Sequence, residues 1–250
     1  ACSKQELYLA WESVNAFTSA YDWSAAAVCP PPPAPPPSPP LAPPPSPRAP
    51  GSGVFTDGAG LKAAVDDLAT AEATHGPLAG WDVSRVDDLT DLFGGQDAFN
   101  DDIGGWDTSS VSSLEGTFWC ATSFNRYIGA WDTSKVKTMK NAFNGAAVYD
   151  QPLGSWDTSE VTDTYWIFNG ATAFDQPDLS RWDVSKMSSG EFHGMFTASA
   201  LGGNDCSKRR VYEGWERQGT FNANAKFQLW GTGECSTSSP PPQPTTPPPL

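Results

Sequence analysis

Residues 128–136 read Ile-Gly-Ala-Trp-Asp-Thr-Ser-Lys-Val, and close copies of this stretch recur along the chain. The core of each copy, Trp-Asp-(Thr/Val)-Ser, recurs at spacings of 25, 25, 25 and 26 residues. Self-similarity at a fixed period of this length is typical of proteins built from stacked repeats. The sequence therefore predicts a solenoid of five coils, whose first Trp-Asp residues are Trp81, Trp106, Trp131, Trp156 and Trp182.

Apolar residues keep one register within the repeats. An aliphatic residue lies three positions before each Trp, and Val or Met lies five positions after it. Each repeat has too few large apolar residues for a core of its own, so the repeats must stack. Exposed tryptophans could stack on sugars, but their place among aliphatic positions favours burial. We expect the core to include the five tryptophans and the plus-twelve phenylalanines Phe93, Phe118, Phe143 and Phe168.

The local patterns predict an α/β coil. The Ile/Leu-x-x-Trp-Asp segment is typical of a short parallel strand, and the spacing in residues 136–143 is typical of a short helix or 3₁₀ turn. Before the first coil, Leu61, Ala64, Val65 and Leu68 form a helical stripe, so we expect a helical N-terminal cap.

The two ends of the chain resemble each other. Cys2-Ser3-Lys4 matches Cys206-Ser207-Lys208, both copies end in a cysteine, and a Pro-rich tract follows each copy. We interpret the chain as a segment of a tandem array. The expected divisions are a preceding module's C-terminal cap (1–29), a polyproline II linker (30–50), an N-terminal cap (51–80), five coils (81–205), a C-terminal cap (206–235) and a second Pro-rich linker (236–250).

Cysteine placement predicts an oxidising, extracellular compartment. The pairs Cys2–Cys29 and Cys206–Cys235 bracket the two similar segments, and each disulfide would contribute about 3 to 4 kcal/mol. Cys120 occupies a position that is Gly or Ala in the other repeats, so we interpret it as a tolerated small residue rather than a reactive thiol.

Composition argues against several functions. A net charge of -14 and a pI near 4.3 disfavour nucleic acid and anionic membranes, and no apolar run is long enough to span a bilayer. With two histidines and no phosphate-binding loop, we expect no enzyme activity, no metal site and no cofactor. The repeated aspartates could bind Ca²⁺ between coils, but capping of local turns explains them better. They are Asp82, Asp107, Asp132, Asp157 and Asp183.

The coil at residues 128–136, the run Ala-Thr-Ser-Phe-Asn at 121–125 and the entry at Phe55 resemble BspA-like leucine-rich-repeat surface proteins. The resemblance covers about residues 54–235 and the cap copy at 2–29, and it departs at Thr164-Tyr165-Trp166 and at Cys120. It implies a leucine-rich-repeat-like fold and a secreted, cell-surface or cell-wall location, often with an adhesive role. It carries no catalytic motif.

The Pro-rich tracts resemble hydroxyproline-rich glycoproteins of algal and plant cell walls. That resemblance implies hydroxylation and O-glycosylation, whereas a bare spacer remains the alternative. The candidate positions are Pro31, Pro32, Pro33, Pro36, Pro37, Ser38, Pro40, Pro44, Pro45, Ser46, Pro241, Pro242, Thr245, Thr246, Pro248 and Pro249.

Two functions follow from these patterns. The first is a non-enzymatic structural module of an extracellular fibre, wall or appendage, joined to neighbouring copies in tandem or head to tail. The second is an adhesion module that binds a glycan or a protein through an exposed face. A column of varied residues on that face favours the structural role; its members are Arg85, Ser110, Lys135, Glu160 and Lys186.

Overall fold

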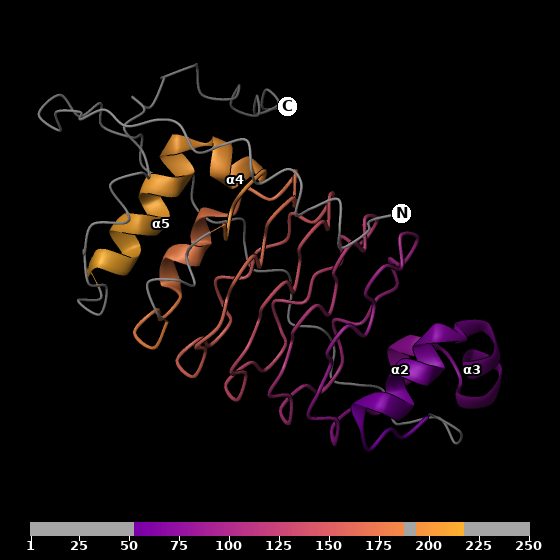
Figure 1. Cartoon of the computed structure of the whole chain (residues 1–250). Helices are drawn as coiled ribbons and strands as arrows, with labels where there is room; N and C mark the ends of the chain where they lie inside the picture. Colours follow the sequence, from indigo (N-terminus) through magenta and orange to yellow (C-terminus); the bar gives the residue numbers. More distant parts are fainter. Residues whose placement is uncertain (1–52, 188–193, 218–250) are drawn as a thin grey trace, which may run out of the picture.

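The computed structural model describes residues 53–187 and 194–217, which form a row of coils between two groups of helices (Figure 1). Helices α2 and α3 lie at one end of the row, and α4 and α5 lie at the other. In chain order the elements are α2 (Gly58–Asp66), α3 (Leu68–His75), the 3₁₀ turn η1 (Leu78–Gly80), the 3₁₀ helix η2 (Pro177–Arg181), α4 (Ala200–Gly203) and α5 (Asp205–Arg217).

Helix α2 begins at a capped end. The Asp57 carboxylate accepts a hydrogen bond of 2.8 Å from the Gly60 amide, which has no partner within the helix. Leu61 and Val65, four residues apart, are buried against the first coil. At Asp67 the backbone leaves the helical region (φ -124°, ψ 57°), so two helices stand where the apolar stripe predicts one.

Backbone hydrogen bonds join each coil to the next at a constant offset. The Phe118 amide donates to the Ala142 carbonyl at 2.8 Å, and the Phe143 amide donates to the Ile167 carbonyl at 2.8 Å. Residues 88, 113, 138 and 163 pair in succession in parallel orientation. These bridges are single pairs, and the described residues contain no continuous strand. The offset fixes which residues of adjacent coils face one another.

The segment predicted to be helical is a run of tight turns. The Leu92 amide donates to the Leu89 carbonyl at 3.2 Å, and the Gln96 amide donates to the Phe93 carbonyl at 3.1 Å. The third residue of such a turn needs a positive φ, which a right-handed helix cannot contain. Two columns of residues meet this need: Asp91, Gly116, Asn141, Trp166 and Gly194 in one, and Gly95, Cys120, Gly145, Gly170 and Ala198 in the other.

The segment predicted to be extended also differs. In Ile128-Gly129-Ala130-Trp131 the Trp131 amide closes a turn on the Ile128 carbonyl at 3.1 Å, and the same turn precedes the other Trp residues. The positions assigned to strand and helix within the coil were therefore wrong. Tight turns and helices share an inward spacing of three to four residues, which explains the error.

Candidate functional site

The repeated tryptophans form a buried, hydrogen-bonded column. Their exposed fractions are 4% or less, so none can serve as a sugar platform on the surface. The Trp131 indole Nε1–H donates to the Ile103 carbonyl of the preceding coil at 3.0 Å, and Trp156 repeats the contact with Ile128 at 3.0 Å. Each tryptophan thus fills the core and ties its coil to the one before.

A second buried column is aromatic throughout. Phe118 stacks on Phe143 of the next coil with ring centroids 5.3 Å apart, and on Phe124 of its own coil at 4.1 Å. Phe93 and Phe168 make the same contacts at their positions in the column. Stacked rings gain about 0.5 to 1.5 kcal/mol beyond area burial, so this column adds to the attraction between coils.

The repeated aspartates act within their own turns. The Asp132 carboxylate accepts from the Ser134 amide at 3.0 Å and from its hydroxyl at 2.7 Å, and these bonds lower the pKa of the Asp132 carboxyl. Bonds from Ser159 lower the pKa of Asp157 in the same way. The first, second and fifth aspartates cap the amide two residues on as well. Among the described residues, no group of three or more His, Cys, Asp or Glu could hold a metal ion.

Asparagine and aspartate side chains link the coils along another edge. The Asn125 amide donates to the Asn100 Oδ1 at 3.0 Å, the Asp150 amide to the Asn125 Oδ1 at 3.0 Å, and the Asp175 amide to the Asp150 Oδ1 at 3.1 Å. Asn204 ends the series by donating to Asp175 Oδ2 at 2.7 Å. This column is therefore a set of bonds between coils.

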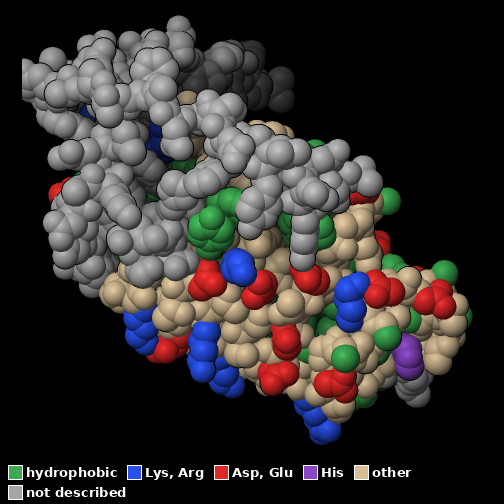
Figure 2. Space-filling view, in the orientation of Figure 1, with side chains coloured by type: hydrophobic (Ala, Val, Ile, Leu, Met, Phe, Trp, Pro, Cys, Tyr) green, Lys and Arg blue, Asp and Glu red, His purple; other side chains and the backbone are tan. Residues whose placement is uncertain are grey.

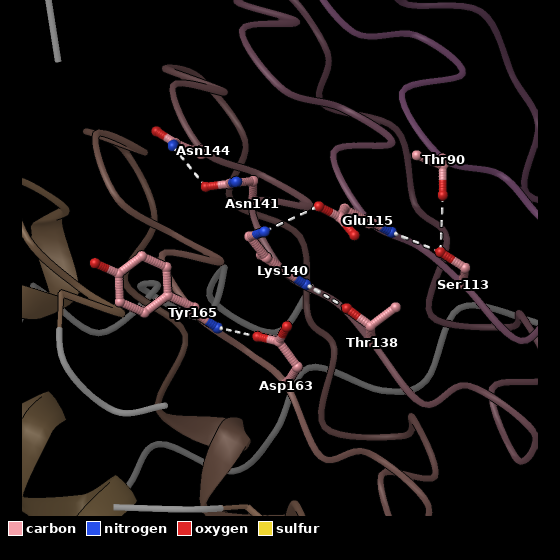
Figure 3. A network of polar contacts seen from close by, with 9 residues as sticks. All are labelled: Thr90, Ser113, Glu115, Thr138, Lys140, Asn141, Asn144, Asp163 and Tyr165. Carbon is pink, nitrogen blue, oxygen red and sulfur yellow. Dashed lines mark hydrogen bonds and ion pairs between the residues drawn. The ribbon is translucent and has the colours of Figure 1, made fainter. Parts of the chain in front are cut away.

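One exposed face carries polar contacts that cross between coils (Figure 3). Thr90 and Ser113 hydroxyls lie 2.9 Å apart, and the Lys140 ammonium lies 3.2 Å from the Glu115 carboxylate. On a neighbouring column, Lys186 pairs with Glu160 at 2.6 Å. Exposed pairs of this kind contribute about 0.2 to 1 kcal/mol each. In the predicted variable column, Arg85, Lys135, Glu160 and Lys186 are exposed, whereas Ser110 is half-buried and donates to the Ser84 carbonyl at 2.7 Å.

The sequence gave no sign of a buried polar group in the third and fourth coils. Tyr149 takes the place of a phenylalanine, is fully buried, and has a hydroxyl without a hydrogen-bond partner. Burial raises the pKa of the Tyr149 phenol well above its ordinary value, and the negative charge of Asp178 adds to the effect. Burial likewise raises the pKa of the Asp178 carboxyl, although the Gly154 amide donates to its Oδ2 at 2.6 Å and opposes the shift. The Asp178 Oδ1 has no partner.

The cysteines fall into two groups. Cys120 is a buried free thiol whose backbone has a φ of 53°. Cys206 is disulfide-bonded. Cys2, Cys29 and Cys235 lie outside the described residues, as do all the candidate hydroxylation and glycosylation positions, so both disulfide pairings and the modifications stay predictions.

Coils that repeat every 25 residues, each with a buried tryptophan bonded to the coil before, define the class of repeat proteins. Within that class, a family described as "Mycoplasma protein of unknown function, DUF285" matches residues 63–177 and 121–230. The matches together span more than half of the chain, so the chain belongs to this family. Membership agrees with the resemblance to BspA-like repeat proteins.

Searches of curated proteins and of solved structures found no match. Across the described ranges 53–187 and 194–217, none of the helices has the length and apolar character that crossing a bilayer requires.

Proposed function

We propose that the chain is a non-enzymatic structural module of an extracellular fibre, cell wall or surface appendage. In this proposal residues 81–205 form a leucine-rich-repeat-like α/β solenoid, and Pro-rich, O-glycosylated linkers join it to neighbouring copies. Two capped ends and two disulfides, Cys2–Cys29 and Cys206–Cys235, complete the proposed organisation.

One observation carries the proposal: the polar residues that recur in the repeats are used within the stack. The Trp indoles and the Thr133 and Thr158 hydroxyls donate to neighbouring coils, and the repeated Asp and Asn residues accept from backbone amides. A catalytic or binding constellation would instead present such groups to a ligand. Repetition of bonds between coils is what a load-bearing element needs.

The surface supports the same role. In Figure 2 acidic and basic side chains alternate over the visible face and do not gather into a patch of one sign. Mixed charges of this kind favour solubility and give little long-range attraction for one charged ligand.

Glycopeptide mapping of residues 30–50, together with electron microscopy of the protein from its natural source, tests the proposal. We expect mass increments of proline hydroxylation with pentose or hexose units, on filamentous particles. Unmodified peptides from separate, compact particles would contradict it.

The second candidate is an adhesion module that recognises a glycan or protein through the coil face. The half-buried pair Tyr165 and Trp166 favours it, because their rings stack at 4.8 Å beside the polar contacts of Figure 3. Aromatic faces near hydrogen-bonding side chains suit sugars. Binding to a glycan panel that is lost in Tyr165→Ala and kept in Lys135→Ala would support this candidate.

A further inference from the structure

The hydrogen bonds between coils run in files of peptide groups that point the same way. In one file the amides of Phe93, Phe118, Phe143 and Phe168 each donate to the next coil, at 2.8 to 3.0 Å. A second file does the same through the amides of Gly95, Cys120, Gly145 and Gly170, at 2.6 to 2.8 Å. Each peptide group accepts from the coil before and donates to the coil after. Two shorter files begin at the amides of Leu89 and Asp91.

The left-handed residues produce this alignment. In an ordinary sheet successive peptide groups point in opposite directions, so their dipoles nearly cancel. Here residues of positive φ alternate with others, and that conformation turns successive amides to one side. Aligned peptide dipoles leave partial positive charge at the amide end and partial negative charge at the carbonyl end, as in a helix. Two flanking columns, which include the bonds from Ser112 to Asp87 and from Ser123 to Asp97, run the other way.

At the N-terminal end the files stop in carbonyl groups. The carbonyls of Thr90, Leu92 and Gly94 accept no hydrogen bond from any described residue. The cap leaves them uncovered because it holds the other side of the coil, where the Trp81 indole donates to the Gly76 carbonyl at 2.8 Å. Helix α2 approaches this strip only at Gly58, which packs on the Asp88 carbonyl.

At the C-terminal end the files stop in amide groups. The amides of Gly194 and Ala198 donate to no acceptor in the described part of the chain. The cap again covers the tryptophan side, where the Trp215 indole donates to the Leu179 carbonyl of η2 at 2.8 Å. Both caps therefore leave the same strip of the coil open.

We propose that a second copy of this module docks head to tail on these strips. The Gly194 amide would donate to the Thr90 carbonyl of the next copy, and the Ala198 amide to its Gly94 carbonyl. This pairing repeats the register in which Asn141 donates to Tyr165 and Gly170 donates to Thr197 within the stack. The ends are complementary in hydrogen bonding and in partial charge, and a head-to-tail contact that does not close into a ring builds a filament. The inference rests on the structural role proposed above.

A pair of like charges across the junction tests the contact. Gly94 and Thr197 occupy the same column and would face each other between copies. That column accepts side chains, since Trp119 and Asn144 occupy it in other coils, and Gly94 has no positive φ. The 250-residue chain and its variants, first checked for folding by circular dichroism, would be compared by sedimentation velocity over a concentration series at low salt.

We expect the unsubstituted chain to associate reversibly and the variant with both Gly94→Lys and Thr197→Lys to associate at least tenfold more weakly. Gly94→Glu with Thr197→Lys should restore association, and Lys135→Glu on the lateral face should leave it unchanged. A chain that stays monomeric, or association that the two lysines leave unaltered, would overturn the proposal. Either result leaves the structural role standing, because glycopeptide mapping tests that role separately.

Discussion

A single tryptophan has two separable effects in the coil. Trp131 fills core volume and donates its indole N–H to the Ile103 carbonyl. We expect Trp131→Ala to lower the free energy of unfolding by about 3 to 5 kcal/mol, because it leaves a cavity. Trp131→Phe keeps much of the volume and leaves a buried carbonyl without its donor, at about 1 to 3 kcal/mol. Urea unfolding measures both, and a loss below about 1 kcal/mol for the alanine variant would contradict burial of this column.

Glycine at a positive φ can be separated from glycine in open space. Gly95 has a φ of 75° and Gly105 has no positive φ, while an added Cβ would meet nothing within 4 Å at either position. Gly95→Ala should therefore destabilise the module by about 1 to 2 kcal/mol through backbone strain alone. Gly105→Ala, the matched control, should be neutral or stabilising by about 0.4 to 1 kcal/mol. Equal effects in thermal unfolding would rule out this explanation.

The buried carboxyl of Asp178 gives the module a pH dependence. Its folded-state pKa is raised, so between the unfolded and folded values the folded chain binds more protons, and stability falls as pH rises through that window. Asp178→Asn, which can still accept from Gly154, should unfold at higher urea than the parent at pH 7. The difference should shrink towards about pH 4, where an ordinary aspartate begins to protonate. A constant difference at both pH values would exclude this account.

Among the elements, α5 continues the contacts of the coils with a different backbone. Trp215 takes the next place in the indole column by donating to the Leu179 carbonyl, although it lies in a helix. Gly214 approaches Ser180 so closely that an added Cβ would lie 2.4 Å from the Ser180 carbonyl oxygen. The helix therefore completes the hydrogen bonding of the last coil on its tryptophan side.

We expect Trp215→Ala to release α5 before the coils unfold. Hydrogen exchange of amides in residues 177–187 should then accelerate, whereas amides in residues 111–124, three coils away, should keep their protection. The exposed variant Arg217→Ala serves as a control, because its side chain makes only an exposed ion pair with Glu213. Equal acceleration in both segments would mean that the cap and the coils unfold as one unit.

Sequence patterns located some of these elements and missed others. The period of 25 residues and the Asp-x-Ser caps could be predicted because each repeat states them again. The tight turns could not, because Asp91, Asn141 and Trp166 occupy positions of positive φ that usually need glycine. The place of Trp215 in the column depends on three-dimensional register, which a single copy of the cap helix does not reveal.

At the scale of the whole molecule, the constant offset predicts which deletions the fold tolerates. Removing residues 107–131 joins Trp106 to Asp132 and preserves the register of every remaining coil. We expect a folded protein whose urea m-value falls roughly in proportion to the surface removed. Removing residues 107–126 instead shifts the register by five residues and should prevent cooperative unfolding. Equivalent stability of the two deletions would show that register does not matter.

The tryptophan column also makes the molecule an optical reporter of its own order. Trp106 and Trp131 lie 6.4 Å apart with planes 1° from parallel, and Trp156 and Trp182 lie 6.4 Å apart at 4°. Indoles that are this close and this parallel couple their electronic transitions and exchange excitation energy. Near-ultraviolet circular dichroism and fluorescence anisotropy will therefore respond when one coil slips relative to its neighbour, before the chain has lost its compact form.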